Sequence, residues 1–121
     1  MKDTAVEFNK LLFDVLVHQI NTLSTHYCYF GKLEEALEIC DWCEKVLAAY
    51  SSKPEFVTET LSWVLKKFNF SKMSAYIKAG EQEKAKEVCD AYLKEVRENN
   101  VYSEEEYRAV EKEFKEQIYI L

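Results

Sequence analysis

The sequence contains one local pattern twice, and each copy begins at one of the two glycines of the chain. Gly31-Lys-Leu-Glu-Glu-Ala-Leu-Glu-Ile-Cys-Asp and Gly80-Glu-Gln-Glu-Lys-Ala-Lys-Glu-Val-Cys-Asp share a glycine, an alanine, a cysteine and acidic residues at an offset of 49. The same offset pairs Tyr27 with Tyr76, Leu12 with Leu61, Val15 with Val64 and Leu16 with Leu65. Such a period indicates stacked supersecondary units, each of which buries its apolar face against the next.

Helices are the expected building element of each unit. Two glycines and one proline in 121 residues are too few for the turns of a β-sheet. Apolar residues instead recur at three- and four-residue spacings, as they do along one face of a helix. We therefore predict an all-α fold of about five helices, at about residues 4–30, 33–50, 54–79, 82–98 and 103–119.

These helices group into one domain over residues 1–121. Repeat one covers about residues 4–50, repeat two covers about 54–98, and a C-terminal capping helix covers about 103–119. Solenoid-like stacks need such a cap, because the last repeat otherwise leaves its apolar face bare.

Three S/T-x-x-E capping boxes mark predicted helix starts, since the hydroxyl and the carboxylate each satisfy a free backbone N–H. They are Thr4 with Glu7, Ser52 with Glu55, and Ser103 with Glu106, and Pro54 adds a first-turn proline. We expect Gly31, Gly80 and Asn99-Asn100 to end helices in the left-handed conformation. Asn21-Thr22 and Asn69-Phe70-Ser71 have poor helix propensity and are candidate kinks.

The apolar spacing also predicts which side chains are buried. For the first helix the stripe is Phe8, Leu11, Leu12, Val15, Leu16, Ile20, Leu23 and Tyr27. For the second it is Leu33, Ala36, Leu37, Cys40, Cys43 and Leu47, and for the last it is Tyr107, Val110, Phe114 and Ile118.

The order Tyr-x-x-x-Gly-x-x-x-x-Ala, present from Tyr27 and from Tyr76, resembles the tetratricopeptide repeat (TPR). The likeness covers Tyr27–Cys43 and Tyr76–Tyr92, so it spans less than a third of the chain. The period of 49 is longer than the family's usual period of about 34. Asn69 and Lys72 also replace the apolar pair Ile20 and Leu23 of the first copy, and the family's terminating proline is missing.

The resemblance implies two stacked TPR-like helical hairpins with a binding groove lined by the first helix of each hairpin. In this sequence the groove residues would be His18, Asn21, Thr25 and Cys28 in repeat one, and Lys67, Phe70, Ser74 and Ile77 in repeat two. Apart from Asn21, the Lys and Asn residues by which one subclass binds a peptide carboxylate do not occur at these positions. We expect Trp63 and Phe70 to belong to the core, the alternative being exposed anchors for a partner.

Charge narrows the range of partners. The chain has 16 basic and 22 acidic residues, a formal net charge of −6, which opposes binding to phosphate backbones, so we expect no direct nucleic-acid contact. It contains no apolar run of about 20 residues that could cross a membrane, and its N-terminus lacks the features of a secretory signal. We expect a cytoplasmic protein, whose four cysteines are reduced thiols.

Cys40-Asp-Trp-Cys43 is a C-x-x-C motif, which in redox proteins lies at a helix N-terminus. Here it falls in mid-helix and Cys40 recurs as Cys89, so we interpret these cysteines as core residues. A zinc site of His26, Cys28, Cys40 and Cys43 is the alternative, but His26 and Cys28 lie about 200° apart on a helix. We predict no metal and no cofactor, and we assign His18 and His26 to solvated or hydrogen-bonded positions.

The sequence contains no nucleotide-binding, hydrolase or metalloprotease motif, so we expect no catalytic residue and no enzyme activity. The leading hypothesis is a non-enzymatic module that binds a protein or peptide through a surface groove. The alternative is a small acidic inhibitor, of the kind found in mobile elements, that imitates nucleic acid and blocks a basic site. It requires Glu34, Glu38, Asp41, Glu104, Glu105, Glu111 and Glu113 to form one patch. A third hypothesis is a homodimer that covers the apolar groove.

Overall fold

The computed structural model describes the backbone of residues 4–52 and 59–119, and all the regular structure in these ranges is helical. The five helices are α1 (Thr4–Phe30), α2 (Leu33–Ser51), α3 (Glu59–Lys78), α4 (Gln82–Glu98) and α5 (Glu104–Tyr119). The predicted all-α class with about five helices is thus confirmed. In the part of the chain that is described, no helix has the length and apolar character of a membrane span.

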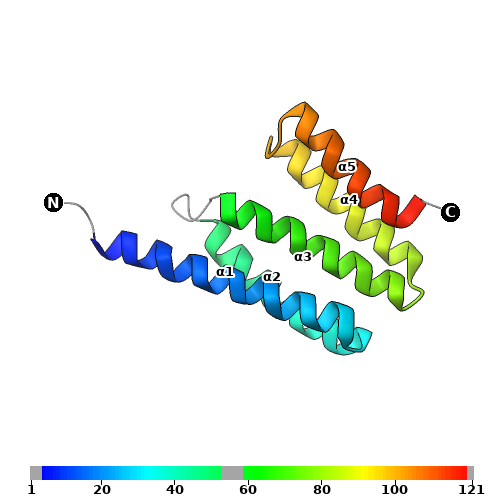
Figure 1. Ribbon diagram of the computed structural model, residues 1–121, viewed down its shortest axis with the longest axis horizontal. Coiled ribbons are helices and arrows are strands. Elements are labelled where there is room, and N and C mark those ends of the chain that lie inside the picture. Colours follow the sequence, from blue (N-terminus) through cyan, green and yellow to red (C-terminus); the bar gives the residue numbers. More distant parts are fainter. Residues whose placement is uncertain (1–3, 53–58, 120–121) are drawn as a thin grey trace.

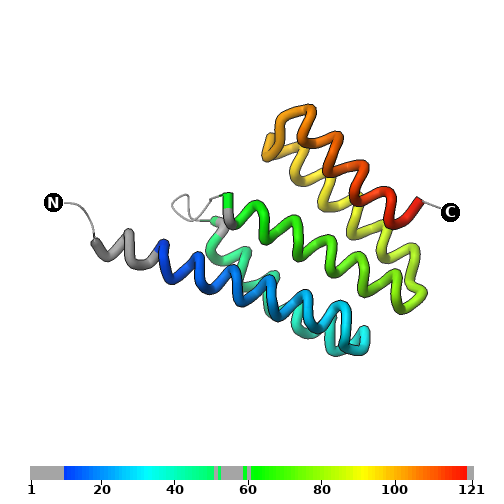
Figure 2. The backbone as a smooth tube through the Cα atoms, in the orientation of Figure 1, coloured from blue at the N-terminus to red at the C-terminus, as the bar shows by residue number. Residues whose placement is uncertain are grey.

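The helices form a stack in which α3 is the central element (Figure 1). α1 and α2 make one antiparallel hairpin, α3 and α4 make a second, and α5 packs on α4. α3 contacts each of the other four helices, and its most extensive packing is with α1. The backbone trace shows α1 and α2 at one end of this stack and α5 at the other (Figure 2).

Two clusters of buried side chains fill the stack and meet at α3. The first joins α1, α2 and the side of α3 that carries Leu61, Val64, Phe68 and Ala75, and its largest members are Phe13, Val17, Ile20, Leu47, Leu61 and Phe68. The second joins the rest of α3 to α4 and α5, and includes Met73, Cys89, Tyr92, Val96, Val110, Phe114 and Ile118. Tyr92 stacks on Phe114 with the ring centroids 4.8 Å apart, so α4 and α5 are held by an aromatic pair as well as by area burial.

The predicted buried stripes are correct for α2 and α5 but wrong at three positions of α1, and Phe8 of the predicted stripe lies outside the residues whose side chains are described. Leu11, Leu12 and Val15 are 61%, 51% and 54% exposed, while Phe13 and Val17 are buried in their place. α1 is apolar on more than one face, so spacing alone did not identify the face that contacts α2 and α3. Leu61 and Val64, which correspond in repeat two to Leu12 and Val15, are buried because α1 covers them.

The two glycines end their helices for different physical reasons. Gly80 has φ +80, and Gly80 N and Glu81 N donate to the carbonyls of Ile77 and Tyr76, which is a Schellman ending. Asn100, at φ 52, ends α4 in the same way. Gly31 does not adopt the expected positive φ; instead a Cβ at this position would lie 2.8 Å from the carbonyl oxygen of Tyr27. Close approach of the backbone, rather than handedness, therefore requires glycine at the first turn.

Side chains satisfy several helix ends. In the predicted capping box at α5, Ser103 N donates to Glu106 Oε1 (3.0 Å) and Glu106 N donates to Ser103 Oγ (3.2 Å). The boxes at Thr4 and Ser52 involve side chains outside the described residues. Lys78 Nζ, at the end of α3, donates to the carbonyls of Tyr29 (2.9 Å) and Gly31 (3.2 Å) at the end of α1. Repeat two thus supplies the cation that complements the C-terminal dipole of α1.

The candidate kinks do not interrupt their helices, which continue through Asn21-Thr22 and through Asn69–Ser71. Polar side chains there bond to their own helix: Thr22 Oγ1 donates to the carbonyl of His18 (3.0 Å), and Asn69 Nδ2 donates to that of Leu65 (2.8 Å). Their hydrogen-bonding groups are therefore accommodated without a break.

Candidate binding surfaces

The predicted groove residues lie on a surface that we call the α1/α3 face, defined by His18, Asn21 and Thr25 of α1 and Trp63, Lys67, Phe70 and Ser74 of α3. His18 and Lys67 are exposed and flank Trp63: the rings of His18 and Trp63 are 6.1 Å apart, and Lys67 Nζ lies 5.9 Å from the Trp63 ring centroid. Trp63 itself is 43% exposed, so its assignment to the core was wrong.

The remaining predicted groove residues are less accessible. Phe70 is half-buried and packs edge-on against Phe114, with ring centroids 5.4 Å apart. Ser74 Oγ donates to the carbonyl of Phe70 (3.0 Å) and accepts from the Tyr29 hydroxyl (3.3 Å). Thr25 and Ile77 are half-buried, and Ile77 packs against the second core cluster.

Asn21 and Cys28 behave differently from the other groove residues. Asn21 Oδ1 is buried and accepts no hydrogen bond from any described residue. An unsatisfied acceptor of this kind costs about 1–3 kcal/mol. Cys28 does not line a surface at all: it is 1% exposed, because it faces α2 and its Sγ lies 3.6 Å from that of Cys40.

All four cysteines are free and buried. The contact between the two thiols and their burial raise the pKa of Cys28, whereas the same contact lowers the pKa of Cys40. Burial raises the pKa of Cys43 and of Cys89 to about 11. A raised pKa makes a thiol a weaker nucleophile at neutral pH, and both members of the C-x-x-C pair are buried as core residues are.

The residues of the alternative zinc site are not brought together. His26 is exposed and its ring packs against Tyr27 and Phe30, both at 5.5 Å, while Cys28 points into the core. Within the described ranges, no three His, Cys, Asp or Glu side chains are grouped as metal ligands would be.

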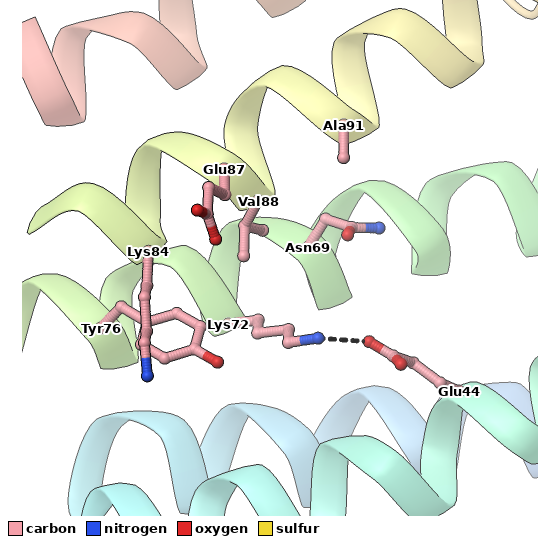
Figure 3. A pocket seen from close by; sticks show the side chains of 8 residues that line it. All are labelled: Glu44, Asn69, Lys72, Tyr76, Lys84, Glu87, Val88 and Ala91. Carbon is pink, nitrogen blue, oxygen red and sulfur yellow. Dashed lines mark hydrogen bonds and ion pairs between the residues drawn. The ribbon is translucent and has the colours of Figure 1, made fainter. Parts of the chain in front are cut away.

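A hollow lies on the opposite side of α3 from Lys67 and Phe70, and we call it the trough. It consists of cavities of about 420 and 310 Å³ between α2 and α4 and one of about 80 Å³ between α3 and α4, and Asn69 lines all three. Figure 3 shows α3 at its floor, with Glu44 of α2 on one side and Lys84, Glu87, Val88 and Ala91 of α4 on the other. The trough is open because α2 and α4 each pack on α3 rather than on one another.

The trough has a more apolar end and a charged end. Leu47, Ala48, Leu65 and Phe68 line the more apolar end, together with Glu44, Asn69 and Glu95. At the charged end Lys72 forms an ion pair with Glu44, and this carboxylate, by hydrogen bond and charge, raises the pKa of Lys72 against the opposing effect of burial. The ammonium group of Lys84 points into the same space beside Tyr76 and has no ion-pair partner among the described residues (Figure 3).

The sequence-based site missed the trough, although a signal for it was present. Asn69 and Lys72 occupy the positions that Ile20 and Leu23 hold in repeat one. Ile20 is buried, whereas Asn69 and Lys72 are half-buried and line the trough. Polar replacements at core positions of a repeat indicate a place where the packing opens to solvent.

The acidic residues of the inhibitor hypothesis fall into two groups. Glu34, Glu38 and Asp41 lie on α2, whereas Glu104, Glu105, Glu111 and Glu113 lie on α5, with α3 between the two helices (Figure 1). Four of them form ion pairs, Asp41 with Lys45, Glu104 with Arg97 and Arg108, Glu111 with Lys115, and Glu113 with Lys66.

Comparison with known proteins gives no family model, no curated protein and no solved structure that matches this chain.

Proposed function

We propose that this chain is a non-enzymatic, protein-binding helical module that holds a peptide segment of another protein in the trough. The observation that carries the proposal is a pair of cavities over α3 that share Glu44 and Asn69 in their lining and measure about 420 and 310 Å³. Ligand sites usually combine such a concavity with an apolar lining and a few placed polar groups.

The lining defines the kind of segment that fits. Leu47, Leu65 and Phe68 favour an apolar side chain at one end, where burial contributes about 1.5–3 kcal/mol. Lys84 favours an acidic side chain at the other end, where Lys72 and Glu44 pair with each other. The exposed Glu87 in the same cavity offsets part of this attraction, so the pair contributes about 1 kcal/mol or less. The preferred ligand is therefore a peptide that carries an apolar anchor and an acidic residue.

The distribution of acidic side chains gives the inhibitor alternative less support. A nucleic-acid mimic presents one continuous negative surface to its target, whereas the acids here are divided between α2 and α5 and several are ion-paired. Binding through such a surface would weaken strongly with salt, whereas an apolar anchor would be less affected.

The first test selects peptides from a random displayed library on the wild-type protein and measures their affinity by fluorescence anisotropy. Ala91→Arg places a long side chain in the trough from an exposed position on α4, and we expect affinity to fall about tenfold or more. Ala109→Arg makes the same change at an exposed position of α5 outside the cavities and should leave binding unchanged. Selected peptides that bind Ala91→Arg as tightly as the wild type would contradict the trough as the site.

The same peptides distinguish the trough from the α1/α3 face. Trp63→Ser and Lys67→Glu change exposed side chains of the α1/α3 face, on the far side of α3 from the trough. We expect neither substitution to alter peptide affinity. Loss of binding in these variants, with Ala91→Arg unaffected, would move the site to the groove that the TPR resemblance implies.

A further inference from the structure

One face of α1 is exposed from Leu11 to Phe30, and we call it the outer face. Its central residues are Leu12, Val15, Gln19, Thr22 and His26, which recur at spacings of three and four and are all exposed. Leu11 and Phe30, 61% and 79% exposed, flank it at the two ends. Leu11, Leu12, Val15 and Phe30 thus expose apolar area on one side of α1, of the kind that helices usually cover by packing against another helix, while Gln19, Thr22 and His26 between them are polar.

The molecule itself shows how this face is used in the second repeat. Leu61, Val64, Phe68, Ser71 and Ala75 lie 49 residues after the five central residues of the outer face, and all of them are buried. Leu61, Val64, Phe68 and Ala75 belong to the core cluster that α3 forms with α1. The outer face of α1 is therefore the register equivalent of an established helix–helix interface.

We propose that a second copy of this chain covers the outer face, through the outer face of its own α1. In a head-to-tail contact, the outer face of one copy would meet the other end of the stack of the next copy. That end exposes charged residues of α5, which do not complement an apolar face; they are Arg108, Lys112, Lys115 and Glu116. The α1 end is the apolar one, so like surfaces pair around a two-fold axis and the assembly closes as a dimer.

The charge distribution is compatible with self-association at this face. The chain has a formal net charge of −6, but residues 10–30 contain one basic residue, Lys10, and one acidic residue, Asp14, besides two histidines. The repulsion between two acidic protomers is therefore smallest where their α1 helices meet.

The order of residues along the outer face favours an antiparallel pair. The face is apolar at both ends, at Leu12 and Val15 and again at Phe30, and polar at Gln19 and Thr22 in the middle. A two-fold axis near residues 20 and 21 brings Leu12 opposite the partner's Phe30 and Val15 opposite the partner's His26. The contact extends over about 27 Å at 1.5 Å per residue, and it leaves the trough, which involves α2, α3 and α4, open.

The mass of the protein in solution tests the dimer. Sedimentation equilibrium of the wild-type chain from about 1 μM to about 1 mM should show dimers of the 14.3 kDa protomer. Val15→Glu should weaken the dimer about tenfold or more, because it buries a carboxylate at an apolar position within the contact. Val101→Glu, the same change at a 41% exposed position in the α4–α5 turn, should leave the dimer intact.

Both positions are exposed, so we expect both variants to fold, and circular dichroism checks this. A wild-type protein that stays monomeric at about 1 mM would overturn the proposal. A dimer that Val15→Glu leaves unchanged would do the same. Ala91→Arg should remain a dimer, so failure of the peptide-binding proposal and failure of this one give different results.

Disulfide cross-linking tests the antiparallel orientation. The native thiols are buried, so thiols introduced by Val15→Cys and His26→Cys are the accessible ones, and an added mild oxidant converts pairs of them to disulfides. The double variant should form a covalent dimer, whereas Val15→Cys alone should not, because its two copies lie about 16 Å apart along the axis. Efficient cross-linking of Val15→Cys alone would overturn the antiparallel arrangement.

Discussion

At the scale of single residues, the two turn glycines differ in what they tolerate. Gly80 has a positive φ, and no atom lies within 4 Å of the place that a Cβ would take, so only its backbone conformation is restrictive. Gly31 has no positive φ, but a Cβ would meet the Tyr27 carbonyl at 2.8 Å. Equivalent positions of the repeat are thus constrained by handedness in one copy and by steric contact in the other.

Substitution by asparagine should separate these two constraints. Gly80→Ala should lower the free energy of unfolding by about 1–2 kcal/mol, and Gly80→Asn by less, because asparagine accepts the left-handed region. Gly31→Ala and Gly31→Asn should both cost about 1–3 kcal/mol, since any Cβ clashes. Urea denaturation of the four variants measures this, and a Gly31→Asn protein as stable as the wild type would refute the steric explanation.

The buried thiols make stability depend on pH in the alkaline range. Burial raises the folded-state pKa of Cys43 and Cys89 to about 11, above the value of about 9 that an exposed thiol has. Both thiols are protonated in either state well below pH 9, so their contribution is complete there. Between pH 9 and about 11 the unfolded state loses these thiol protons while the folded state keeps them, so stability is lost as pH rises. For each thiol, the equilibrium constant of unfolding increases by up to about tenfold per pH unit.

Urea denaturation at pH 8 and at pH 10.5 checks this expectation. The variant with Cys43→Ala and Cys89→Ala should be less stable at pH 8, because it loses buried volume, but it should lose less further stability on going to pH 10.5. Burial raises the pKa of Tyr92 as well, and this residue contributes a decrease of the same sign above about pH 10 in both proteins. An equal pH dependence in the two proteins would remove the thiols as its cause.

At the scale of secondary structure elements, the start of α5 depends on one side chain. Ser103 and Glu106 exchange hydrogen bonds with each other's backbone N–H, and the Ser103 backbone bond lowers the pKa of Glu106. Ser103→Ala should lower the free energy of unfolding by about 1 kcal/mol. Ser103→Asp should keep most of the wild-type stability, because aspartate also caps helices. Thermal denaturation measures both, and an unchanged Ser103→Ala protein would contradict the cap.

Element positions were largely predictable from local signals in the sequence. Helix ends at Gly80 and Asn100 and the helix start at Ser103 follow from single-residue preferences, and the stripes of α2 and α5 follow from spacing. The buried face of α1 could not be predicted in this way, because Phe13 and Leu12 are equally apolar and only the position of α3 decides which of them is covered. The α1/α3 face was predicted only by resemblance, and His18 and Lys67 do lie together around Trp63.

At the scale of the whole molecule, the trough and the outer face both arise from how the helices stack. The trough exists because α2 and α4 each pack on α3 and leave Asn69 and Lys72 between them. The outer face exists because α1 is the first helix of the stack (Figure 2). Neither arrangement can be read from the periodicity of one segment, since both depend on the relative placement of helices from different repeats.

The contacts of α3 with every other helix have a consequence for how the protein opens in its native state. α1 can separate from one side of the stack and α5 from the other. The backbone of α3 becomes accessible to solvent only when both core clusters come apart. Local opening needs less free energy than global unfolding, so amide protons near the ends of the stack exchange with water first. The amides of α3 around Phe68 should exchange last, at a rate that reports the stability of the entire molecule.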